Sequence, residues 1–109
     1  IATQQVLVYI LSGVKPRVSS EFIEMYRKGT KPERDISQEE LVEICELLSI
    51  SIDHTATDYV AGVFNVFKEY TVSTGSTLSN VDDALAFNNF HEGIHLGSVL
   101  ALRHAIGLV

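Results

Sequence analysis

The chain is poor in the residues that mark several common classes of protein. Its single cysteine, Cys45, cannot form a disulfide within the chain, which fits a reducing compartment, and we expect a cytoplasmic protein. No apolar window reaches the roughly 18 uninterrupted residues that a membrane-spanning helix needs. The eight basic residues are scattered and are outnumbered by 14 acidic ones. The net charge of −6 argues against a nucleic-acid or anionic-membrane partner, because both attract basic patches.

What is present is an ordinary globular composition. Hydrophobic residues make up 46% and charged residues 20% of the 109 residues, which is enough for one domain with one core. The chain starts at Ile1 without Met, and residues 1–9 already have the pattern of a helix interior with no capping residue ahead of them. We therefore expect a single domain over residues 1–109 that is truncated at its N-terminus.

Two helices are predicted from the glycines that follow them. The first runs from about Ile1 to Leu11 and ends at Ser12-Gly13, and the second runs from about Ser20 to Lys28 and is closed by Gly29.

The next helix has a clearer start. Ser37 and Glu40 form a capping box, and Ile36 and Leu41 flank it as a hydrophobic staple. Apolar residues then keep helical spacing to about Val63.

The C-terminal third is predicted to be one long helix. It follows a turn-rich loop at residues 71–76, begins near residues 77–80 and continues to about Ile106. No segment has the pattern of a strand. The predicted fold class is therefore all-α, an up-and-down antiparallel helix bundle.

The motif His91-Glu92-Gly93-Ile94-His95 is the strongest pointer to chemistry. Two histidines four residues apart lie on one face of a helix, close enough to share a cation at the usual metal–nitrogen distance of ~2.1 Å. At about 100° per residue, a helical wheel places both in the centre of the core-facing stripe. The other members of that stripe are Ala84, Phe87, Asn88, Ile94, Ser98, Leu102 and Ala105. Two imidazoles favour a divalent transition metal such as Zn, Ni or Fe without completing its site. The alternative is a pair of interior histidines, each hydrogen-bonded to a core hydroxyl or amide.

The remaining candidate ligands are less well placed. His104 lies on the far side of its helix from His91, and His54 lies opposite the apolar stripe of its own helix, so we expect both to be exposed. Cys45 is expected on the inner face of its helix as a small buried apolar residue.

A zinc peptidase also carries H-E-x-x-H, with the glutamate as general base. Here the extended form of the motif fails at Ser98 and Ala101, and no acidic residue follows His95 to serve as a third ligand. On the wheel, Glu92 projects about 100° away from His91. The peptidase is kept only as a remote alternative.

The C-terminal region resembles a known family. It is similar to the last helix of the DinB/YfiT-like superfamily, which typically carries H-E-x-x-H-x-G and a leucine–arginine pair. The similarity covers the run from Thr77-Leu78 through residues 83–97, followed by Leu102-Arg103. Residues 21–23 and 26–32 are similar, more weakly, to the connector between the second and third helices of that family.

The resemblance implies a four-helix bundle that holds a divalent metal with three histidines. Two of them correspond to His91 and His95, and the third would lie in the second helix, immediately before Ile1. The family's first helix would also precede this chain. Characterised relatives include S-transferases and isomerases that use a low-molecular-weight thiol such as bacillithiol or mycothiol, so the resemblance implies a thiol-dependent S-transferase as one candidate activity.

The rival interpretation is a non-catalytic helical module that acts as a homodimer. The outward side of the last helix carries small and apolar residues where solvent would favour charge: Ala86, Gly93, Leu96, Gly97 and Leu100. The alternative explanation of this face is packing against the first helix that the resemblance places before this chain. The sequence names no substrate and no catalytic residue. Tyr9, Tyr70 and Asn88 are candidates for lining a pocket beside the metal ligands.

Overall fold

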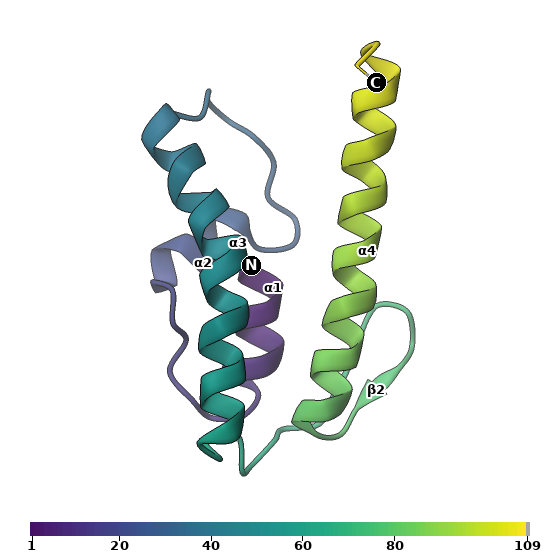
Figure 1. Cartoon of the computed structure of the whole chain (residues 1–109). Helices are drawn as coiled ribbons and strands as arrows, with labels where there is room; N and C mark the ends of the chain where they lie inside the picture. Colours follow the sequence, from purple (N-terminus) through teal and green to yellow (C-terminus); the bar gives the residue numbers. More distant parts are fainter. Residues whose placement is uncertain (109) are drawn as a thin grey trace.

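The fold is mostly helical, as predicted, and the computed structural model describes residues 1–108. Its elements, in chain order, are α1 (Ala2–Gln4), the π-helical η1 (Gln5–Ile10), α2 (Ser20–Tyr26), α3 (Gln38–Val60), β1 (Tyr70–Thr71), β2 (Thr77–Leu78) and α4 (Val81–Ala105). The long helices α3 and α4 form two rods, with the N-terminal segment between them (Figure 1).

Side-chain caps fix where the main helices begin. The hydroxyl of Ser37 accepts a hydrogen bond from the backbone N–H of Glu40 at 3.1 Å, which confirms the predicted start of α3. The carboxylate of Glu40 is used in a longer-range contact, because it accepts hydrogen bonds from Arg34 at 2.8 Å and from the hydroxyl of Tyr26. Asn80 caps α4 through the N–H of Asp83 at 2.8 Å.

The first helical segment differs from the prediction in its geometry. Residues 5–10 form π-helical turns, with bonds such as the one from the N–H of Leu11 to the carbonyl of Val6 at 3.1 Å. The segment ends where expected, at Gly13, whose φ of +68° is readily adopted only by glycine. The short helix α2 also stops earlier than predicted, at Tyr26, because Arg27 is already extended.

The prediction that no strand is present was wrong. Residues 70–78 form an antiparallel hairpin in which Thr71 pairs with Thr77 and Tyr70 with Leu78. The turn between them uses Gly75 at φ +89°. Each strand has only two residues, so the alternation that identifies a strand in a sequence has no room to develop.

This hairpin helps to build the hydrophobic core. Val72 and Leu78 are buried in one cluster with Ala84 of α4 and with Leu7, Val8 and Tyr9 of the first segment. The ring of Phe64 packs edge-on against Tyr9, with centroids 5.1 Å apart. The core therefore lies where the N-terminal segment, the hairpin and the first half of α4 meet.

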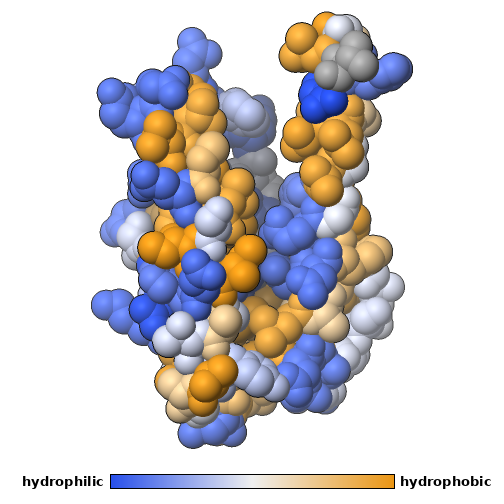
Figure 2. All heavy atoms as spheres, in the orientation of Figure 1, coloured by the Kyte–Doolittle hydropathy of each residue, from blue (hydrophilic) through white to orange (hydrophobic). Residues whose placement is uncertain are grey.

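The C-terminal half of α4 extends beyond this core. The 25 residues of α4 span about 38 Å, and the α4 residues that join or pack against the core lie between Val81 and Phe87. Ile94 and Leu102, expected to face the core, are 50% and 66% exposed, so that part of the prediction was wrong. Figure 2 shows apolar side chains along both long helices, with open space between their far ends. None of the helices in residues 1–108 has the length and apolar character needed to cross a membrane.

Candidate metal site

The two histidines of the motif face each other across one turn of α4. His91 and His95 place their Nε2 atoms 3.2 Å apart, with the rings edge to face and 4.5 Å between centroids. Two nitrogens that each lie ~2.1 Å from one ion would be about 3.0 Å apart at a right angle and about 3.4 Å apart at the tetrahedral angle. The observed separation falls between these values and is also a hydrogen-bonding distance between the two rings, so the distance alone is compatible with a shared cation.

The surroundings of the two rings differ. His91 is half-buried and stacks on Phe87, with centroids 6.1 Å apart and the planes 20° from parallel. His95 is exposed, so the expectation that both rings lie in the centre of a buried stripe holds only for the first. The stripe beside His95 is exposed among the described residues, with Ile94 at 50% and Leu102 at 66%.

The protonation of His91 favours a ligand role. Burial, and secondarily the neighbouring His95, lower the pKa of His91 below its usual value. The ring is therefore neutral at physiological pH, which is the form that binds a metal. Its Nδ1 atom is buried without a hydrogen-bond partner, and so is Oδ1 of Asn88, one turn earlier on the same side of the helix.

The chain brings Glu92 and the start of the first helix to the same place. The amino nitrogen of Ile1 lies 3.9 Å from Oε1 of Glu92, whose side chain is 44% exposed. Glu92 therefore points toward the chain start. Within residues 1–108, no group of three or more histidine, cysteine or acidic side chains is close enough to hold a metal on its own.

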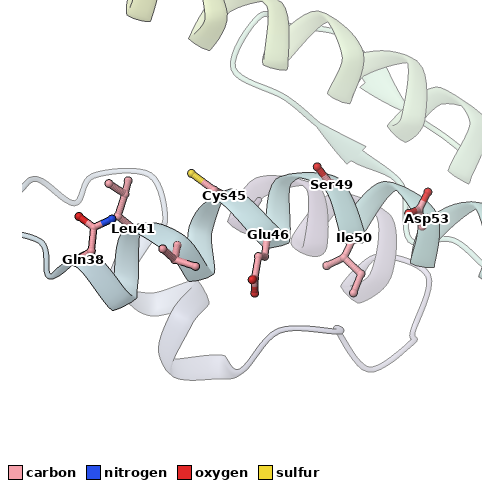
Figure 3. A pocket seen from close by; sticks show the side chains of 8 residues that line it. Gln38, Leu41, Cys45, Glu46, Ser49, Ile50 and Asp53 are labelled. Carbon is pink, nitrogen blue, oxygen red and sulfur yellow. The ribbon is translucent and has the colours of Figure 1, made fainter.

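The other candidate ligands lie elsewhere. His104 is exposed, as predicted, whereas His54 is half-buried on α3. Cys45 was expected to be buried but is exposed on α3. It lines a shallow groove along α3 (Figure 3) together with Gln38, Leu41, Val42, Glu46, Ser49, Ile50 and Asp53.

The structure also contains a buried polar cluster that the sequence did not reveal. The carboxylate of Asp58 accepts hydrogen bonds from the hydroxyl of Tyr9 at 2.6 Å and from Arg17 at 2.9 and 2.5 Å. Gln4 extends the cluster by donating to the hydroxyl of Thr55 at 2.8 Å. Arg17 and Tyr9 hold the pKa of Asp58 below its usual value, and burial, reinforced by Asp58, raises the pKa of Tyr9.

This cluster changes the role expected for the tyrosines. Tyr9 is 1% exposed and its hydroxyl is engaged by α3, so it joins two helices and does not line a pocket beside the histidines. Tyr70 is 49% exposed on the hairpin. The partners Arg17 and Asp58 are 41 residues apart in the chain, and no local pattern connects residues at that separation.

A scan against protein-family models found no match for this chain, and searches of curated proteins and of solved structures found none either.

Proposed function

We propose that this protein binds a divalent transition metal through Nε2 of His91 and Nε2 of His95, in the manner of the DinB/YfiT-like superfamily. The observation that carries the proposal is the 3.2 Å separation of these two atoms. The lowered pKa of His91 adds to it, because a ring kept neutral needs no proton release before it binds a cation.

The remaining ligands must come from outside the pair. The resemblance puts a third histidine at the position directly before Ile1, and the amino nitrogen of Ile1 lies 3.9 Å from Glu92, the residue between the two ligands. A histidine at that position would stand beside the motif. A fourth position left to solvent or to a small molecule would make the site a reactive one.

The chemistry proposed for the site is transfer involving a low-molecular-weight thiol. A bound Zn, Ni or Fe ion would supply a Lewis acid that ionises the thiol near neutral pH. The residues of this chain support such a role in two ways. Phe87 holds the ring of His91 by stacking, and the exposure of His95 leaves the outer side of the pair open to an incoming molecule.

Metal binding can be tested directly on the purified full-length protein. After treatment with a chelator, titration with Zn or Ni followed by calorimetry is expected to give one equivalent per chain. His91→Ala and His95→Ala should each weaken binding by about 100-fold or more, since the loss of a ligand exceeds the loss of a supporting residue.

The matched control is His104→Ala, a change at an exposed histidine on the same helix that should leave the affinity as it was. Full-length protein that carries no stoichiometric metal, and takes up none from either titration, refutes the proposal.

A second candidate is a dimerising helical module without catalysis. It is favoured by the large apolar side chains that α4 leaves exposed after His91: Ile94, Leu96, Val99, Leu100 and Leu102. Replacing His91 with alanine separates the two candidates, because a module should associate unchanged after the loss of a metal ligand.

A further inference from the structure

We infer that the amide oxygen of Asn88 accepts a hydrogen bond from Nδ1–H of His91 and thereby positions this ring as a metal ligand. Asn88 is a positioning residue, which acts through His91 and does not itself touch the metal. The purpose of the bond rests on the metal binding proposed above, whereas the bond itself can be tested in metal-free protein.

Two buried atoms without partners lie one turn apart on α4. Among residues 1–108, the buried side-chain nitrogen and oxygen atoms that lack a hydrogen-bond partner are Oγ of Ser12, Oδ1 of Asn88 and Nδ1 of His91. Ser12 follows η1, whereas Asn88 and His91 are three residues apart on one helix. At this spacing, side chains are neighbours with Cβ atoms about 5–6 Å apart. An amide oxygen accepts and Nδ1 can donate, so one hydrogen bond satisfies both atoms.

The ring of His91 lies over the turn that contains Asn88. Side chains on a helix lean toward its N-terminus. The ring of His91 does so, because it stacks on Phe87 with centroids 6.1 Å apart. Nδ1 is the ring nitrogen nearer to the backbone, and the backbone carbonyls of this turn already accept hydrogen bonds within the helix. The acceptor left for Nδ1 in this turn is therefore Oδ1 of Asn88.

This hydrogen bond decides which nitrogen of His91 carries the proton. A neutral imidazole has one N–H and one lone pair, and a metal binds only to the lone pair. With the proton held on Nδ1, the lone pair of His91 is on Nε2, the atom that lies 3.2 Å from Nε2 of His95. The opposite tautomer would put a proton in the ligand position. It would also leave Nδ1 of His91 and Oδ1 of Asn88 as two buried acceptors without a donor, which is unfavourable.

The ring of His95 needs no fixed tautomer. Without a metal, Nε2 of His95 donates a hydrogen bond to the lone pair on Nε2 of His91, because a contact between two ring nitrogens requires one proton. To bind a metal, His95 must carry its proton on Nδ1 instead. His95 is exposed, so water can accept a hydrogen bond there. The pair thus combines one ring whose proton is held by the protein with one ring whose proton can move.

The test is the tautomer of His91 in metal-free, full-length protein at about pH 8, above the ordinary histidine pKa of about 6.5. Long-range proton–nitrogen NMR correlations distinguish a protonated ring nitrogen from an unprotonated one, and His91→Ala assigns the signals. In the wild type, the proton of His91 is expected on Nδ1. Asn88→Leu keeps a similar size but removes the acceptor, so it should shift His91 toward the Nε2–H tautomer.

Two further variants isolate the role of the amide oxygen. Asn88→Asp can accept a hydrogen bond but cannot donate one, so it should keep the wild-type tautomer. The matched control is Asn89→Leu, the same substitution at the exposed neighbouring asparagine, and it should change neither the tautomer nor the metal affinity. Circular dichroism checks that every variant keeps its helical content.

Zinc affinity is the second measurement. Asn88→Leu should weaken zinc binding about 10- to 100-fold with the stoichiometry unchanged, which is the usual effect of removing the partner of a ligating histidine. The inference is overturned if wild-type His91 carries its proton on Nε2, because Asn88 would then be the donor. It is also overturned if Asn88→Leu leaves both the tautomer and the affinity as they were.

Failure of the proposed function would look different. A wild type that takes up no metal, with a tautomer of His91 that still changes in Asn88→Leu, would refute metal binding and support the hydrogen bond. A wild type that binds zinc as tightly as Asn88→Leu, with the same tautomer in both, would support metal binding and refute the role of Asn88.

Discussion

Replacing Asp58 with alanine tests what joins α3 to the N-terminal segment. Its carboxylate is the common acceptor for Tyr9, which lies in the core, and for Arg17, which lies in the connector after it. The side chain of Asp58 is 10% exposed and that of Arg17 is 41% exposed. Alanine therefore removes a buried acceptor from a buried hydroxyl and from a half-exposed guanidinium.

The two losses differ in size. A hydrogen bond to a charged group contributes about 1.5 to 3 kcal/mol, and the hydroxyl of Tyr9 keeps only a long contact of 3.4 Å to Thr55 once the carboxylate is gone. Arg17 can turn to water, so its ion pair adds no more than about 1 kcal/mol. The expected loss is about 2 to 4 kcal/mol, a large share of the roughly 5 to 15 kcal/mol that stabilises a typical domain.

Urea unfolding followed by circular dichroism measures this loss. Tyr9→Phe is the companion variant, because it keeps the ring packed on Phe64 and removes only the hydroxyl, with an expected cost of about 1 to 2 kcal/mol. The double variant should lose less stability than the sum of the two single losses, since both changes remove the same hydrogen bond. If Asp58→Ala unfolds within about 0.5 kcal/mol of the wild type, the cluster does not hold these helices together.

Three further predictions concern the same framework. The pKa of Asp58 is depressed in the folded state, so its carboxylate contributes fully to stability above the ordinary carboxyl pKa of about 3.9. This contribution should be lost as the pH falls through the lower pKa of the folded state. Urea titrations at several pH values should show that Asp58→Asn lacks this loss. Leu78→Ala should cost about 2 to 4 kcal/mol if the hairpin belongs to the core, whereas Ile52→Ala, at a residue that is 69% exposed, should cost less than about 0.5 kcal/mol in the same assay. Ser37→Ala should remove the cap of α3 and lower stability by about 1 kcal/mol, and an unchanged urea midpoint would show that the cap is dispensable.

Local signals in the sequence were enough to predict the helices. Ser37 marks the start of α3 because a capping hydroxyl acts within three residues, and Gly13 ends the first segment because its backbone angle needs no distant partner. The spacing of His91 and His95 likewise predicted that their rings would meet on one face. Each of these features depends only on residues close together in the chain.

The features that the sequence did not reveal depend on distant neighbours. A helical wheel shows which side of a helix is apolar, but not whether another element lies opposite it. Cys45, Ile94 and Leu102 were therefore expected to be buried, although all three are exposed. The pairing of Arg17 with Asp58 likewise depends on the fold, since it joins a connector to a helix more than 40 residues later.

The uneven packing of α4 gives its two halves different roles. Its first half is held by the core at Ala84 and stacks Phe87 on His91, so the histidine pair begins on a fixed support. Its second half has large apolar side chains exposed, so anything that covers them would add to its stability. Anything that binds only the folded chain raises stability in proportion to the logarithm of its concentration. A metal on the histidines would make unfolding depend on metal concentration alone, whereas a second copy on the exposed apolar side chains of α4, the second candidate function, would make it depend on protein concentration. Thermal unfolding at several protein concentrations, with and without Zn, therefore separates the two proposals in one experiment. A midpoint that responds to neither variable contradicts both.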